Sequence, residues 1–223
     1  MNDTESYLNN IDQQIANKHL LSHPFYQAWT RGELTKECLA EYAAQYYHHV
    51  KAFPTYLSAL HAHTEEAHTR RELLQNLIEE EAGTPNHPDL WKAFGEALSF
   101  TEQASNDEIQ ALINTFRDIC HNGSVAEGLA ALYAYESQIP AVSESKIHGL
   151  KQHYDMTNPK DWRYFTVHIE ADKEHAAVER KLLAQYVNAE NHQAVQASVQ
   201  KVLDRLWDFL TGLCERYEIA CAM

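Results

Sequence analysis

Apolar residues recur through most of the chain at the three- and four-residue spacing of amphipathic α-helices. The clearest case is the segment from about Gln193 to Glu218, where valine and leucine residues fall on one helical face. No stretch bounded by turn residues keeps the strict alternation of apolar and polar positions that marks a half-buried strand. The pattern predicts an all-α protein. Because there is no linker or internal repeat, we expect residues 1–223 to form one helical domain.

Proline, glycine and polar capping residues divide this pattern into separate helices. Pro54 lies inside the longest predicted helix, where we expect a kink. Asn158 and Pro159 predict the start of a helix rich in histidine and acidic residues, with Asn158 as the N-cap and Pro159 in the first helical position. The predicted helical segments are 3–20, 24–29, 35–63, 65–81, 87–98, 106–120, 124–138, 141–153, 158–187 and 193–218.

Composition narrows the possible functions. The chain has 223 residues with only 7 Gly and 6 Pro, so it has few turns and enough length for a sizeable core. Lys and Arg number 18 against 32 Asp and Glu, a net charge of −14 with neutral His. Such an acidic surface repels phosphate backbones and anionic lipids, so we expect neither nucleic acid nor a membrane as a partner. No apolar run approaches the roughly 20 residues needed to cross a bilayer, and the N-terminus is too polar for a signal peptide.

The cysteines are scattered and form no CxxC pair, which is typical of reduced thiols rather than of a disulfide framework or a zinc site. We therefore expect a cytoplasmic protein. The four residues are Cys38, Cys120, Cys214 and Cys221.

Two imidazoles and a carboxylate share one stripe of the predicted helix 158–187. His168, Asp172 and His175 stand at i, i+4 and i+7, so on a helix they project within about 60° of one another. This donor set suits a transition metal, particularly iron or manganese. The alternative is a solvated polar face, although the bordering aromatic residues Tyr164 and Phe165 favour burial.

A metal site in a helical bundle needs donors from further helices. Glu80 and His87 flank a Gly/Pro turn and could converge from the end of one helix and the start of the next, although three consecutive glutamates also suit a solvated helix end. Glu136 closes an almost wholly apolar segment, so it is either at a solvated end or a buried carboxylate that needs a cation. With the stripe, these residues could hold two divalent metals with open positions for dioxygen.

A ferritin-like arrangement is disfavoured. It requires two helices that each bear Glu-x-x-His, and only Glu65 and His68 fit strictly. They stand beside arginine residues, so we interpret them as surface positions.

Several contiguous segments resemble the CADD family, the proteins similar to the chlamydia protein associating with death domains. The resemblance covers nearly the whole chain and implies a haem-oxygenase-like helical bundle, shared with TenA-like and PqqC-like proteins, and a homodimer. The matching segments are HPFY (23–26), RGELTKE (31–37), KAFPTYLSALH (51–61), PNHPDLWKAF (85–94), ALYAYESQIP (131–140) and YFTVHIEADKEH (164–175).

The resemblance also implies an activity. It links the chain to folate biosynthesis through a route to p-aminobenzoate in which the protein is thought to be its own substrate, losing a tyrosine side chain. Tyr26 matches that tyrosine, Lys146 matches the suggested amino-group donor, and Tyr42 and Tyr135 match site tyrosines that could carry oxidising equivalents. The implied cofactors are two divalent metals (iron in both positions, or manganese with iron), dioxygen and an external reductant that the sequence does not identify. By resemblance the ligands are Glu80, His87, Glu136, His168, Asp172 and His175, the donors selected above.

Other interpretations stay open. From the residues alone, the tyrosines suit an aromatic core and Lys146 suits a solvent-exposed position. The alternative functions are a dimetal oxygenase acting on an external small molecule, and a metal-free TenA-like hydrolase or interaction module. A hydrolase would need an activated nucleophile, and the local candidate, Cys120 beside His121, is weak because adjacent helical residues point about 100° apart. Residues 214–223 show no extended tail, so we do not expect death-domain binding.

Overall fold

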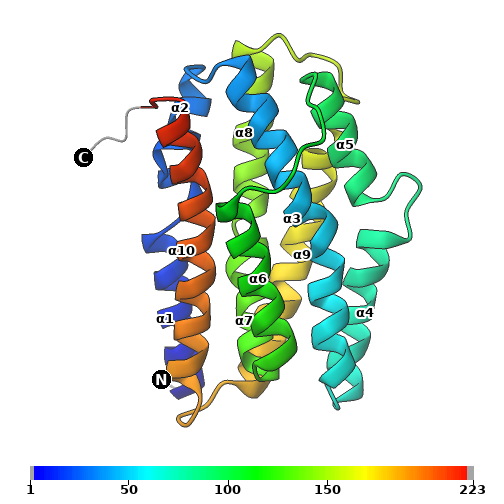
Figure 1. Cartoon of the computed structure of the whole chain (residues 1–223). Helices are drawn as coiled ribbons and strands as arrows, with labels where there is room; N and C mark the ends of the chain where they lie inside the picture. Colours follow the sequence, from blue (N-terminus) through cyan, green and yellow to red (C-terminus); the bar gives the residue numbers. More distant parts are fainter. Residues whose placement is uncertain (1–2, 220–223) are drawn as a thin grey trace.

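The computed structural model describes residues 3–219, which form ten α-helices and one short 3-10 helix and contain no strand (Figure 1). The all-α prediction is therefore confirmed. In chain order the elements are α1 (Asp3–Asn17), η1 (Leu20–Ser22), α2 (Pro24–Arg31), α3 (Lys36–His63), α4 (Ala67–Glu81), α5 (His87–Ala97), α6 (Asp107–Asn122), α7 (Val125–Glu136), α8 (Ile139–His153), α9 (Arg163–Tyr186) and α10 (His192–Arg216).

Local capping explains most of the helix boundaries. The Thr35 side chain accepts a hydrogen bond from the Cys38 amide and begins α3. Capping boxes at Asn86 and Ser124 begin α5 and α7, so the backbone amides of the N-cap and N3 residues are satisfied at each of these helix starts. Gly32, at φ 70°, closes α2 in the left-handed conformation that glycine tolerates best.

The predicted start of α9 is wrong by four residues, because the helix begins at Arg163 and not at Pro159. The Asn158 side chain instead closes a local turn: its amide nitrogen donates to Asp161, and its oxygen accepts from the Lys160 amide. The stripe predicted to bind metal lies inside α9 and is unaffected by this shift. Helix α3 continues through Pro54 as one element from residue 36 to residue 63.

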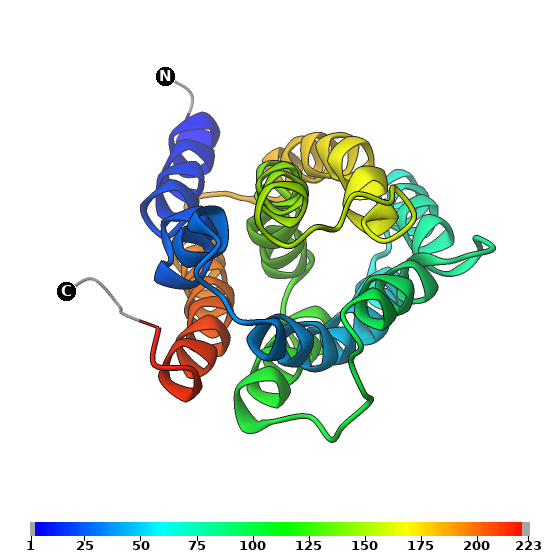
Figure 2. The ribbon, with the colours of Figure 1, turned by 90° about the horizontal axis from the view of Figure 1, so that it is seen from above.

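Six helices surround the interior that contains the candidate site. Viewed from above, α3, α4, α5, α7, α8 and α9 enclose this space, while α1, α2 and α10 lie to one side (Figure 2). Helix α9 packs on α7 and α8, and α3 packs on α4, α5 and α6. Helix α8 approaches α2 closely at Gly149, where an added Cβ would lie 2.6 Å from the Trp29 ring. This approach brings Lys146 of α8 next to the aromatic residues of α2 and α3.

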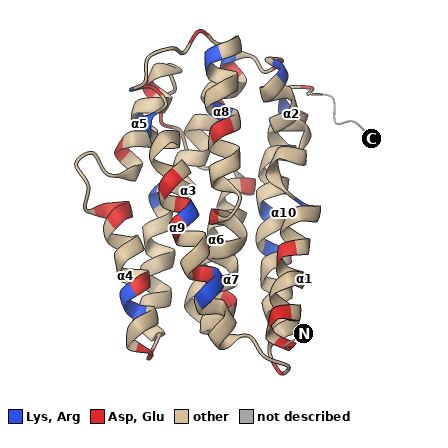
Figure 3. Ribbon diagram, turned by 180° about the vertical axis from the view of Figure 1, so that it is seen from behind, with Lys and Arg blue, Asp and Glu red and all other residues tan. Residues whose placement is uncertain are grey.

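Most charged residues lie on the outside of the bundle, and the cysteines of the described part are buried. Charged positions are spread over the outer faces of the bundle (Figure 3), and no helix of the described part is long and apolar enough to cross a membrane. Cys38 and Cys120 are buried free thiols, and Cys214 is also buried. Cys221 and the end of the C-terminal segment, on which the expectation about death-domain binding depends, lie outside the described residues.

Candidate metal centre

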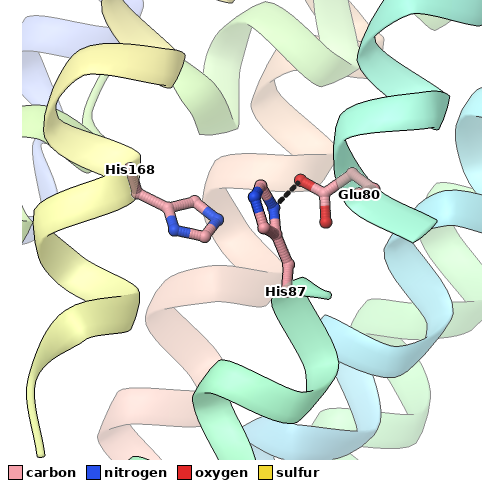
Figure 4. Close-up of side chains that lie close together, drawn as sticks. All are labelled: Glu80, His87 and His168. Carbon is pink, nitrogen blue, oxygen red and sulfur yellow. Dashed lines mark ion pairs between the residues drawn. The ribbon is translucent and has the colours of Figure 1, made fainter. Parts of the chain in front are cut away.

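Three buried donors from three helices meet on one side of the interior. Glu80 comes from the last turn of α4, His87 is the first residue of α5, and His168 comes from α9 (Figure 4). The Glu80 Oε1 and His87 Nδ1 atoms are 2.9 Å apart, and the rings of His87 and His168 have centroids 4.4 Å apart. The turn between α4 and α5 therefore brings Glu80 and His87 together.

A second group of donors lies on the same stripe of α9. Asp172 and His175 meet Glu136, the last residue of α7, which is only 1% exposed. His175 Nδ1 lies 3.3 Å from Glu136 Oε1 and 3.6 Å from Asp172 Oδ1. Of the two alternatives for Glu136, a solvated helix end or a buried carboxylate, the structure shows the buried one.

The donor sets fit two metal ions. Several donor atoms are buried without a hydrogen-bond partner, which is costly unless something else binds them. Neighbouring ligands that each lie about 2.1 Å from one ion, at about 90° to each other, are about 3 Å apart, close to the donor spacings in both groups. Three carboxylates would also offset most of the charge of two divalent ions. The unpartnered atoms include Glu136 Oε2 and Asp172 Oδ2, whereas His87 Nδ1 and His175 Nδ1 face carboxylate oxygens.

The pKa shifts of Asp172 and His175 also favour a bound metal ion. Burial raises the pKa of Asp172 to about 8, because a charged carboxylate is poorly solvated there. Burial opposes a charge on His175 as well, but the Asp172 and Glu136 carboxylates outweigh it and raise the pKa of His175 to about 11. A proton on His175 thus supplies the positive charge that the carboxylates require. A bound metal ion would replace that proton, since a ligating imidazole must be neutral.

Contacts with neighbouring residues orient the candidate ligands. The Nδ1 atom of His168 lies 2.7 Å from the backbone carbonyl of Tyr164, which leaves Nε2 to face the interior. On the other side, His175 Nε2 lies 2.9 Å from Glu79 Oε2, and the Asn76 side chain donates to Glu136 Oε1 over 3.0 Å. Neither Glu79 nor Asn76 was predicted from the sequence to contact the donors. Asn76 stands one helical turn before Glu80, a spacing that would have placed it on the same face.

Glu179 is a further buried carboxylate that the sequence analysis missed. It stands eleven residues after His168, and so continues the stripe of His168, Asp172 and His175 by one turn. Its carboxylate lies against that of Glu136, and neither of its oxygens has a hydrogen-bond partner.

Tyr26, Tyr42 and Lys146, which were predicted to be site residues by resemblance, form a separate hydrogen-bonded cluster. The Tyr26 and Tyr42 hydroxyls are 3.1 Å apart, and Lys146 Nζ donates to the Tyr42 hydroxyl over 2.6 Å. Lys146 is only 4% exposed, so its interpretation as a solvent-exposed lysine is wrong. Burial lowers the pKa of Lys146 to about 7, and the Phe165 ring centroid lies 4.9 Å from Nζ.

Aromatic rings join this cluster to the metal donors. The Tyr164 ring stacks on His168 with centroids 3.9 Å apart, and Trp91 lies 4.8 Å from Tyr164 and 5.9 Å from Tyr42. Trp91 is fixed by a hydrogen bond to the backbone carbonyl of Ala43. Trp91 was not predicted to be near the site, because a buried tryptophan in a helix is ordinarily part of the core.

Tyr135 lies beside the candidate metal donors rather than in the cluster of Tyr26, Tyr42 and Lys146. Its hydroxyl accepts a hydrogen bond from Tyr46 over 2.9 Å. It also lines a small hollow of about 10 Å³ together with members of both donor groups, Glu80 and Asp172 among them. The structure therefore separates Tyr135, beside the donors, from Tyr26 and Tyr42, which lie beyond the intervening rings.

The pair considered for hydrolysis is not an activated nucleophile. Cys120 is fully buried and burial raises its thiol pKa to about 12, whereas His121 is exposed.

Comparisons with known proteins place this geometry in a family. A family model described as iron-containing redox enzyme matches residues 40–207. The chain is 45% identical to the 4-aminobenzoate synthase of Chlamydia pneumoniae, covering 96% of this chain and 97% of that protein, and 43% identical to the 4-aminobenzoate synthase of Nitrosomonas europaea, covering 96% and 93%.

Solved structures show the same fold at lower identity. A TenA homologue from Pseudomonas syringae has a TM-score of 0.78 at 20% identity, with 92% of this chain and 93% of that chain covered. A CADD-like protein of unknown function from Nostoc punctiforme has a TM-score of 0.76 at 16% identity, with 99% of each chain covered. The predicted haem-oxygenase-like, TenA-like bundle is therefore confirmed.

Proposed function

The chain belongs to the iron-containing redox enzyme family as a CADD-like member, and we propose that this enzyme forms 4-aminobenzoate by consuming the side chain of its own Tyr26. The name of the relatives at 43–45% identity supports the product. The buried donors and the Tyr26–Tyr42–Lys146 cluster support the chemistry. The use of an internal tyrosine, rather than an external substrate, rests on the space available inside the bundle.

The small size of the interior hollow is the observation that favours an internal substrate. The hollow that both donor groups line measures about 10 Å³, which is room for about one water molecule. An external aromatic substrate would need a far larger pocket. The Tyr26 ring is already in the interior and is 3% exposed. An external substrate, the alternative function, would require this hollow to enlarge.

The metals would be held in two positions. Glu80, His87 and His168 would bind one divalent ion, and the group of Glu136, Asp172 and His175 would bind the other. We propose iron in both positions, or manganese with iron; with dioxygen and an external reductant these ions would supply the oxidising chemistry.

The residues around Tyr26 prepare its phenol for oxidation. Burial raises the pKa of Tyr26, so the side chain is held as a neutral phenol until an electron is removed. Oxidised phenols release their proton. A neutral Lys146 amine could accept the Tyr42 hydroxyl proton, which would allow the Tyr42 oxygen to accept the proton of Tyr26. The lowered pKa of Lys146 also keeps a lone pair available on Nζ, as an amino-group donor requires.

A tyrosine-to-phenylalanine substitution tests the proposal. Tyr26→Phe removes only the hydroxyl, so metal binding should stay at the wild-type level while 4-aminobenzoate is lost. Tyr133→Phe is the matched control, because Tyr133 hydrogen-bonds to Asp12 away from the cluster and its loss should leave product formation intact. Full product from Tyr26→Phe would refute an internal source.

We also propose that the chain is a single domain that works as a cytoplasmic homodimer, without nucleic acid, membrane or death-domain partners. The resemblance to the CADD family supports the dimer, and the acidic surface and reduced cysteines support the other features. Light scattering of the protein as it elutes from a size-exclusion column would give its molecular mass and so test the dimer.

A further inference from the structure

A second hollow connects the surface with the donors. It lies between α4 and α9 and has a volume of about 120 Å³. Its rim contains the exposed or half-buried carboxylates of Glu72, Glu79 and Glu174, and its wall includes His175. Figure 3 shows acidic positions along α4, which packs against α9. The hollow thus carries carboxylates from its mouth inward to His175, a member of the second donor group, whose imidazole pairs with Glu79 at the rim.

The innermost carboxylate of this hollow has no partner. Glu179 lines the hollow, is 4% exposed, and neither of its oxygens accepts a hydrogen bond. Its carboxylate lies against that of Glu136, and the imidazole of His175 pairs with Glu136 and not with Glu179. Burying an unpaired carboxylate costs several kcal/mol by general estimates, so the arrangement is stable only if a cation or a proton is placed between the groups.

Glu179 also connects the hollow with the candidate ligands. It contacts Glu136 on its inner side and stands one turn after His175 on α9. A cation bound at Glu179 would therefore be next to the second donor group. That group adds an imidazole to its carboxylates and so suits iron or manganese better than carboxylates alone, which favours onward transfer.

We propose that the hollow between α4 and α9 is an uptake site for a divalent metal ion of the Fe²⁺ or Mn²⁺ class, where Glu179 binds the ion before it passes to Glu136, Asp172 and His175. The inference rests on the proposed metal centre. The rim carboxylates concentrate cations from solution at the mouth, and Glu179 replaces part of their hydration shell inside. The ion binds at Glu179 in transit, so Glu179 affects the rate of metal loading and not the final number of ions.

Manganese uptake tests this directly. Metal-free protein is mixed with Mn²⁺, and the loss of the free-ion EPR signal is followed with time, then the bound metal is counted at equilibrium. Glu179→Gln keeps the shape but removes the charge, and should slow uptake at least about tenfold while leaving the final stoichiometry unchanged. Glu170→Gln is the control, since Glu170 is exposed on the same helix outside the hollow and its loss should not alter the rate.

A second variant keeps the test decisive if Glu179→Gln folds poorly. Glu72 and Glu174 lie at the rim, so the double substitution Glu72→Gln/Glu174→Gln should not disturb the core. It should slow uptake about two- to fivefold at low salt and weaken the dependence of the rate on ionic strength.

Three results would overturn the inference in different ways. Equal uptake rates for wild type, Glu179→Gln and the rim variant would refute the uptake site alone. Loss of a bound ion from Glu179→Gln at equilibrium would make Glu179 a permanent ligand, and would also refute it. A wild-type protein that binds no Mn²⁺ or Fe²⁺ would refute the proposed metal centre together with the uptake site.

Discussion

Lys146 should make the stability of the metal-free protein depend on pH. The folded protein holds this amine among aromatic rings, and burial lowers its pKa to about 7 from an ordinary value of 10.5. In the unfolded chain the amine is solvated and keeps its proton. Between these two pKa values the unfolded state binds more protons, so the free energy of unfolding rises with pH. The cost of burying Lys146 is complete below about pH 7 and disappears as the pH approaches 10.5.

The magnitude follows from the two pKa values. Each pKa unit is worth about 1.4 kcal/mol, and the folded amine is half protonated near pH 7 and almost fully neutral near pH 9. Over that interval the contribution of Lys146 to the free energy of unfolding should increase by about 2 kcal/mol. Lys146→Met has no titrating amine, so wild type should gain about 2 kcal/mol relative to this variant between about pH 7 and pH 9.

Urea unfolding at several pH values measures the effect. A chelator keeps both proteins metal-free, so that the titration of the candidate ligands is common to both and cancels in the difference. Lys151→Met removes an exposed lysine from the same helix, and its difference from wild type should stay constant within about 0.5 kcal/mol. If the difference in the free energy of unfolding between wild type and Lys146→Met did not change with pH, the Lys146 amine would not be desolvated. That result would remove the basis for its role as proton acceptor and amino-group donor.

Two further predictions concern packing and metal binding. Gly149→Ala should destabilise the protein by about 1–3 kcal/mol in urea unfolding, because its Cβ would lie 2.6 Å from the Trp29 ring; wild-type stability would show that α2 and α8 can separate without cost. Asp172→Asn should lower the metal content from about two ions per chain to about one, by removing a charged donor from the second group, whereas Asp161→Asn in the exposed turn should not. Two ions retained by Asp172→Asn in elemental analysis would contradict the ligand assignment.

The helical periodicity predicted the part of the site that lies on one helix. His168, Asp172 and His175 converge because 3.6 residues per turn place these positions on one face whatever packs against it. The same rule would have found Glu179. Periodicity was less useful at Glu136, where a helix ends and the neighbouring helices decide whether the carboxylate is buried.

The environment of Lys146 was beyond sequence reasoning. Its own segment is polar, and the aromatic rings around it come from α2, α3, α5 and α9, at distances that only the packed bundle fixes. The prediction of where α9 begins was wrong for a local reason. Asn158 has the composition of a helix cap, but its side chain closes a turn, and the two uses of asparagine look alike in a sequence. The metal ligands and the consumption of Tyr26 stay predictions that experiment must test.

The intact mass of the purified protein, before and after exposure to iron, a reductant and air, tests the central claim most directly when 4-aminobenzoate is assayed in the same sample. The proposed function predicts the loss of a tyrosine-derived fragment, located at Tyr26 by peptide mapping and equal in molar amount to the product. Product formation with an unchanged protein mass would contradict it and would identify an external substrate.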